Sequence, residues 1–241
     1  YNLLDKAAFL KLRYDVIVPT AQLKSFILSA LPISRKKIKV LSSGVDEQIL
    51  LPQQAKHKFQ DLNITMLGTV SKHKGQRYAI EVVKELLKLN LFSSVCISII
   101  GSGSDIDYIQ RKVNDAGLNQ HIKLLGRRDD AFELIARSHI FLHLSESEGL
   151  PLVILEAMSM GVPAIGFDVR GVNDIIRHGE NGYLAGFGDF RGIAQLLANL
   201  HGSNEKYSMM QKNARHIIEN EFSFKDMLLN YEKIILNTLP K

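Results

Sequence analysis

Two glutamates stand eight positions apart in SESEGLPLVILEAM, residues 145–158. Glu148 precedes a predicted helix, and Glu156 falls inside it among Leu, Val, Ile, Ala and Met. A carboxylate on so apolar a helix needs a hydrogen-bonding partner, because desolvation of the charge is costly. The paired hydroxyls of a ribose would satisfy Glu156, and Glu148 would then reach hydroxyls of a sugar beyond a phosphate. The alternative is that both glutamates are ordinary exposed side chains.

The helix that begins near Leu150 is a candidate anion site, since free N–H groups and the positive end of the helix dipole favour a phosphate. Glycine-rich loops follow three other predicted strands, at 68–75, 101–104 and 126–130. Ligands of an open parallel sheet bind beyond the carboxyl ends of its strands, where all these loops would lie. Lys74 would add a positive charge there.

Familiar phosphate and metal motifs do not explain these loops. The chain has no Gly-x4-Gly-Lys-Ser/Thr loop, and Ile106 stands where the dinucleotide fingerprint needs a third glycine. Asp105 and Asp107 form an Asp-x-Asp, but capping and the helix dipole explain acids at a helix start. His139 and His143 lack a third ligand at a suitable spacing. We therefore expect no metal and no cofactor.

The elements that position these residues alternate between strands and helices. Apolar runs predict strands at 15–19, 37–41, 63–69, 95–101, 121–126, 139–145, 162–167 and 182–185. Helical periodicity covers 76–89, 105–117, 130–138, 150–161 and 172–179. Two or three helices follow Asp189, the last over 219–239. Strands that are apolar on both faces predict an α/β fold with a doubly wound parallel sheet.

Composition narrows the classes of partner. With 241 residues and 46% hydrophobic content, the chain can bury a large core. It has no membrane-spanning run and no secretory signal at its start, so we expect a cytoplasmic protein. The net charge of +5 suits anionic ligands and permits peripheral contact with a membrane. Scattered cations without tryptophan argue against nucleic acid. The single cysteine, Cys96, is expected to be a buried thiol.

The motifs together resemble those of a known enzyme family. Their order is that of the retaining GT-B glycosyltransferases of family 4, which carry a Glu-x7-Glu signature. The matching motifs are Ser145-x-x-Glu148-Gly149, Glu156-Ala157-Met158, Gly161-x-Pro163, Gly171-x-x-Asp174 and Gly179-x-Asn181-Gly182. Upstream, the resemblance continues through 122–127, 99–105, 68–75 and 42–46, and it covers roughly residues 14–235.

This resemblance implies a Rossmann-like domain that binds a nucleotide-sugar donor, such as a UDP-sugar, as substrate rather than cofactor. Glu148 and Lys74 would be catalytic, Glu148 holding the donor sugar and Lys74 neutralising the diphosphate. Glu156 would hold the ribose, and Arg127 would flank the base. The donor-binding residues would be Glu156, Gly149, Leu150, Pro151, Arg127, Gly101, Ser102, Gly103 and Thr69. Thr69 departs from the family, which usually has an arginine there.

By the same resemblance, residues 1–41 would be the remnant of an N-terminal acceptor domain and the crossover from it. Residues 42–220 would form the nucleotide-sugar-binding domain, and 221–241 a helix that crosses back toward the missing domain. That domain would hold a glycan, lipid-linked or protein acceptor in polysaccharide biosynthesis. The isolated chain should then bind nucleotide but transfer sugar poorly.

Two other functions remain open at this stage. One is a non-catalytic scaffold of the same fold that binds a partner subunit. Thr69, in place of the arginine usual in the family, would be consistent with lost catalysis. The other is a nucleotide-sugar epimerase of GT-B type, which acts on the donor without an acceptor.

Overall fold

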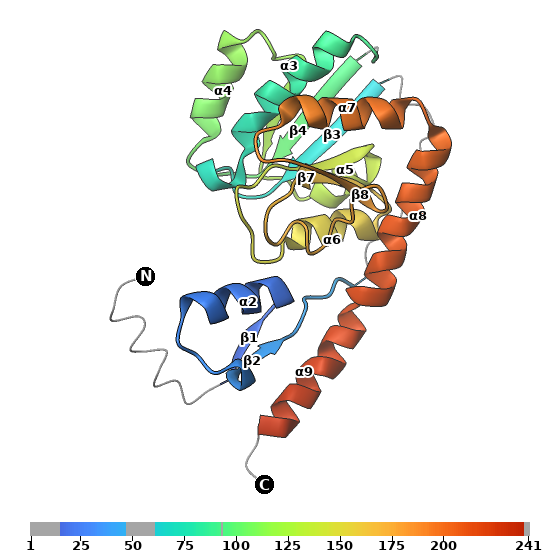
Figure 1. Cartoon of the computed structure of the whole chain (residues 1–241). Helices are drawn as coiled ribbons and strands as arrows, with labels where there is room; N and C mark the ends of the chain where they lie inside the picture. The colour runs from blue at the N-terminus through green and yellow to red at the C-terminus, as the bar shows by residue number, and fades with distance from the viewer. Residues whose placement is uncertain (1–14, 47–60, 93, 239–241) are drawn as a thin grey trace.

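The computed structural model describes residues 15–46, 61–92 and 94–238, and its largest part is a six-stranded parallel sheet. Sheet order is β5-β4-β3-β6-β7-β8, with helices on both faces (Figure 1). The strands are β3 (Asp61–Leu67), β4 (Ser94–Ile100), β5 (Ile122–Gly126), β6 (Ile140–His143), β7 (Ala164–Phe167) and β8 (Gly182–Ala185). The predicted Rossmann-like α/β fold is confirmed, with strand ends displaced by one or two residues.

Each face of this sheet has its own apolar core. Helices α3 (Ala79–Leu89), α4 (Ile106–Asp115) and α7 (Phe190–His201) cover one face. Helices α5 (Ala131–Arg137) and α6 (Leu152–Ser159) cover the other, and α8 (Asn204–Glu221) contributes buried residues to both cores. The middle of β6 shows why both faces are apolar, since Phe141 packs in one core and its neighbour Leu142 in the other.

A smaller body precedes the sheet, and we call residues 15–41 the amino-terminal unit. It contains the two strands predicted at 15–19 and 37–41, with a helix between them: β1 (Val16–Val18), α2 (Ala21–Ala30) and β2 (Ile38–Val40), with the two strands parallel. Thr20 caps α2 by accepting a hydrogen bond from the Leu23 N–H over 3.0 Å. The core of the unit contains only Val18, Leu31, Ile33 and Ile38 as buried residues.

The final helix is shorter than the sequence indicates. Rather than one helix over 219–239, α8 ends at Glu221 and α9 covers Phe224–Thr238. Segment 42–46 crosses this junction: the Val45 N–H donates to the Phe222 carbonyl over 2.9 Å, and Phe224 N–H donates to the Val45 carbonyl. A tertiary backbone pairing thus interrupts a sequence whose local pattern is continuous helix.

Two further expectations are wrong. Residues 172–179 form turns rather than the predicted helix. Gly171 and Gly179 on either side have left-handed φ of +85° and +82°. The Asn181 side chain accepts a hydrogen bond from the Arg177 N–H and donates one to the Ile175 carbonyl, so these backbone groups do not bond within a helix. Cys96 is only half-buried, because its neighbours Val95 and Ile97 take the buried side of β4.

Within the described ranges, no helix is both long and apolar enough to span a membrane.

Candidate functional site

The sheet order brings the predicted site loops to one edge. Strands β3 and β6 are neighbours, so the loop after β3, with Lys74, lies beside the loop after β6, with Glu148. On the other side of β3, strands β4 and β5 direct Gly101–Gly103 and Arg127 to the same edge. Parallel strands share the direction in which their carboxyl ends point, which is why residues distant in sequence meet there.

Glu148 is held by two neighbours. Lys74 Nζ lies 2.8 and 3.0 Å from the two carboxylate oxygens, and His143 Nε2 donates to Oε1 over 3.0 Å. The Glu148 side chain is 10% exposed, whereas that of Lys74 is 39% exposed. Burial acts to raise the pKa of Glu148, but the hydrogen bonds from His143 and Lys74 outweigh it and lower the pKa to about 2. Glu148 is therefore a buried, ionised carboxylate with a cation at its outer side.

The loop of Lys74 is fastened to the loop of Glu148 by a second set of contacts. Arg77 donates to Glu146 over 2.8 Å, and the Glu146 N–H donates to the His73 carbonyl over 2.9 Å. Between these contacts, Gly75 has φ +71°, and a Cβ there would lie 1.9 Å from the Leu144 carbonyl oxygen. Only glycine allows this approach, which places Lys74 within reach of Glu148.

Glu156 has a different environment. Among the described residues, no side chain or backbone group hydrogen-bonds its carboxylate. Burial raises its pKa. It lines a pocket of about 350 Å³ whose other walls are Gly44, Val45, Asp46, Phe132, Leu152 and Phe224. Glu148 is not one of the residues that line this pocket.

Helix α6 begins at Leu152, not at Leu150, so Glu156 lies about one turn into the helix. Pro151 occupies the N-cap position, and no side chain caps the helix start. A Cβ at Gly149 would meet nothing within 4 Å, so packing does not require glycine there. Gly149, Leu150 and Pro151 thus connect Glu148 to a helix start whose first amide groups have no side-chain partner.

The remaining predicted residues form a continuous row of loops. The Val70 N–H, next to Thr69, donates to the Ser102 carbonyl over 3.0 Å, and the Gly101 N–H donates to the Gly126 carbonyl, beside Arg127, over 2.8 Å. A Cβ at Gly103 would lie 2.1 Å from the Val70 carbonyl oxygen. These glycines are therefore needed for loop-to-loop packing, whatever they also contact.

Four residues that hold the site were not assigned this role from the sequence, although His143 was considered there as a metal ligand. His143 bonds Glu148, Glu146 and Arg77 join the two loops, and the buried Gln76 donates to the Thr69 carbonyl over 3.0 Å. The Ser-x-Ser-Glu context of Glu146 offered no signal that separates it from an exposed acid. The position of His143 at the end of β6, five residues before Glu148, was the one usable clue.

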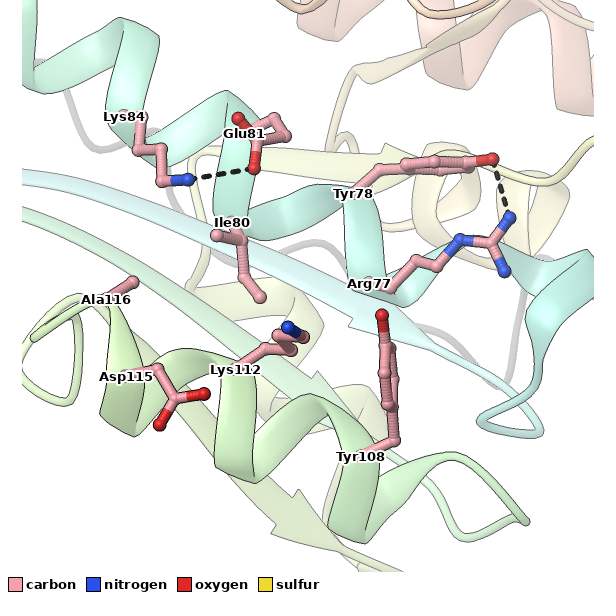
Figure 2. Close-up of a pocket in the computed structure, with 9 residues that line it drawn as sticks. All are labelled: Arg77, Tyr78, Ile80, Glu81, Lys84, Tyr108, Lys112, Asp115 and Ala116. Atoms are coloured by element: carbon pink, nitrogen blue, oxygen red, sulfur yellow. Dashed lines mark hydrogen bonds and ion pairs between the residues drawn. The ribbon is translucent and has the colours of Figure 1, made fainter.

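A second pocket, of about 590 Å³, lies between α3 and α4 (Figure 2). Arg77 and Tyr78 stand at one end of it, and Lys84, Lys112 and Asp115 line the rest. Arg77 donates to the Tyr78 hydroxyl over 2.7 Å as well as to Glu146. The bond to Glu146 directs its guanidinium toward the edge of the sheet where the site loops lie. The pocket contains none of the residues predicted to bind a ligand.

Known proteins resemble this chain in sequence and in fold. The profile of the family described as glycosyl transferases group 1 matches residues 48–217. The chain is 28% identical over 208 residues to the N-acetyl-alpha-D-glucosaminyl L-malate synthase of Bacillus anthracis, covering 85% of this chain and 55% of that protein. It is 29% identical over 212 residues to the UDP-Gal:alpha-D-GlcNAc-diphosphoundecaprenol alpha-1,3-galactosyltransferase of Escherichia coli, covering 83% and 54%. The chain thus spans about half the length of these relatives.

Among solved structures, Anabaena HepE in complex with UDP-glucose superposes with a TM-score of 0.86 at 19% identity, over 97% of this chain and 66% of that one. Staphylococcus aureus TarM gives 0.81 at 23% identity, over 91% and 43%. At this identity, the two structures establish the shared fold.

Proposed function

The chain belongs to the glycosyl transferases group 1 family, and on that premise we propose that it carries the donor-binding half of a retaining, family 4 type transferase. The donor is a nucleotide sugar, with a UDP-sugar the first to test. The observation that carries the proposal is the Lys74–Glu148 pair, held at the start of a helix that no side chain caps. A buried carboxylate, a cation and unoccupied amide groups are what a sugar diphosphate needs within a few ångströms.

In this proposal, Lys74 and the amide groups at the start of α6 donate hydrogen bonds to the diphosphate, and Glu148 accepts hydrogen bonds from the donor sugar. Negative charge grows on the leaving diphosphate as the glycosidic bond breaks, so fixed donors aimed there lower the barrier. These groups supply that stabilisation without a metal ion or cofactor. Gly149 leaves open space beside Glu148 for the sugar.

Glu156 binds the ribose in the pocket that it shares with segment 44–46 and α9. Its desolvated carboxylate has no partner among the described residues, and a pair of hydroxyls would supply one. The base of the nucleotide is flanked by Thr69, Ser102 and Arg127. The acceptor is a glycan or lipid-linked sugar held by a domain that would precede the amino-terminal unit, a choice supported by the lipid-linked acceptor named for the E. coli relative.

Calorimetry with UDP tests the proposal. We expect Glu156→Ala to weaken UDP binding about tenfold or more, because a hydrogen bond to a charged group is lost. Glu205→Ala, which removes an exposed glutamate from α8, serves as the matched control and should bind UDP like the wild type. A folded wild-type chain without affinity for UDP, GDP or ADP would contradict the proposal and favour a scaffold.

A further inference from the structure

Arg170 connects the amino-terminal unit to the site. It lies in the loop after β7, and its guanidinium carbon stands 4.0 Å from the centre of the Phe26 ring in α2. Phe26 is not one of the side chains that pack in the core of the unit, and it is 43% exposed. A guanidinium over an aromatic face is attracted by the ring quadrupole, so the contact joins two bodies that otherwise have separate cores.

The Phe26 ring is the specific partner of this guanidinium. Across the part of the chain that the structure describes, no carboxylate forms an ion pair with Arg170. Its Nε is buried and has no hydrogen-bond acceptor there. Loss of the ring would therefore remove the attraction that holds the half-buried guanidinium against α2.

The backbone of the same residue holds Glu148. The Glu148 N–H donates to the Arg170 carbonyl over 3.2 Å. At the next position, Gly171 has φ +85°, and a Cβ there would lie 2.7 Å from the Glu148 carbonyl oxygen. With contacts this close, the chain at 170–171 cannot shift without moving Glu148.

We propose that Arg170 is a positioning residue that couples the amino-terminal unit to the loop of Glu148, through its guanidinium on Phe26 and its carbonyl on the Glu148 amide. Displacement of α2 from the main domain therefore loosens the carboxylate. The effect on sugar binding rests on the function proposed above, whereas the mechanical coupling does not depend on it. In Figure 1, α2 lies on the same side of the sheet domain as α6, the helix that follows Glu148.

Hydrogen exchange of the Glu148 amide, followed by NMR in the 241-residue chain, tests the coupling directly. Phe26→Ala and Arg170→Ala should each speed this exchange by about threefold or more, the fold-change expected from one lost cation–π contact. The double variant should exchange no faster than either single variant, because both remove the same contact. Phe26→Tyr keeps the ring and should behave like the wild type.

Amides in β4 give the control, since they should keep their wild-type exchange in every variant. Unchanged exchange at Glu148 in both alanine variants, or purely additive effects, would overturn the proposal. So would a Phe26→Tyr chain that exchanges like Phe26→Ala. If Arg170→Ala fails to fold, the comparison of Phe26→Ala with Phe26→Tyr still decides, because Phe26 is outside the core.

A binding measurement separates this proposal from the preceding one. In Phe26→Ala, the affinity for a UDP-sugar should fall toward that for UDP, while UDP itself binds as in the wild type through Glu156. A wild-type chain that binds neither compound refutes the proposed function, and the exchange result then still decides the coupling.

Discussion

The carboxylate of Glu148 stays ionised because His143 and Lys74 both donate to it. Glu156, eight positions later, meets only desolvation, and its pKa moves in the opposite direction. The same type of side chain thus has two environments: Glu148 is hydrogen-bonded and ionised, whereas the carboxylate of Glu156 is desolvated and has no hydrogen-bond partner among the described residues. This contrast in environment favours separate roles for the two carboxylates.

The ionised state of Glu148 contributes to stability with a defined pH dependence. Its pKa is about 2 in the folded protein against 4.5 as the reference. The contribution is therefore complete above pH 4.5 and is lost as pH falls toward 2, with about 2 kcal/mol gone by pH 3. Urea unfolding of the wild type and Glu148→Gln from pH 7 to pH 3 should show a steeper loss in the wild type. Parallel profiles would contradict this, and Glu205→Gln should follow the wild type.

At the scale of elements, the site depends on loops that approach one another more closely than side chains would allow. Gly75 meets the Leu144 carbonyl, Gly103 that of Val70, and Gly171 the backbone of Glu148. The strands set the direction of these loops, and the glycines set the distance between them. Gly149 differs, since its Cβ position is empty and its place in the motif has no packing reason.

Gly75→Ala should separate the two loops. The added Cβ would meet Leu144 O at 1.9 Å, so we expect the free energy of unfolding to fall by about 2 kcal/mol or more. Gly117→Ala is a matched control, because Gly117 has a similar φ of +69° but an open Cβ position. It should cost only backbone strain, about 1 kcal/mol. Equal losses in urea unfolding would show that the approach to Leu144 contributes nothing.

At the scale of the whole molecule, the residues that the structure describes form a large sheet domain, a small amino-terminal unit and the final helix α9. Segment 42–46 and the α8–α9 junction link them through backbone pairing, and Arg170 adds a side-chain contact. The pocket of Glu156 is built partly from this linking segment and from α9.

The two bodies should differ in local stability. The amino-terminal unit has two strands and four buried core residues, whereas β3 and β4 each lie between two other strands in a six-stranded sheet. Short two-stranded sheets are marginally stable alone. Hydrogen exchange measured by mass spectrometry should therefore be at least about tenfold faster in β1 and β2 than in β3 and β4. Equal protection would mean that the whole described chain opens as one unit.

Sequence alone determined the alternation of strands and helices, the parallel sheet and most of the site loops. Periodicity and glycine are local signals, and they identified even the short strand β8 at 182–185. The family motifs added residue roles that stay predictions for Glu148, Glu156 and Lys74. Local signals failed where tertiary contacts decide, as in the turns at 172–179 and the break in the last helix at Ser223.

Only the tertiary structure decided which partners the charged residues have. Lys74 and Glu148 are 74 positions apart, and no pattern in the sequence states that they form a pair rather than facing a ligand separately. The same holds for Arg170 and Phe26, whose contact joins two bodies. The physical reason is that an ion pair or a stacked ring depends on a few ångströms of separation. That separation follows from strand order and loop packing, and neither is encoded within any one segment.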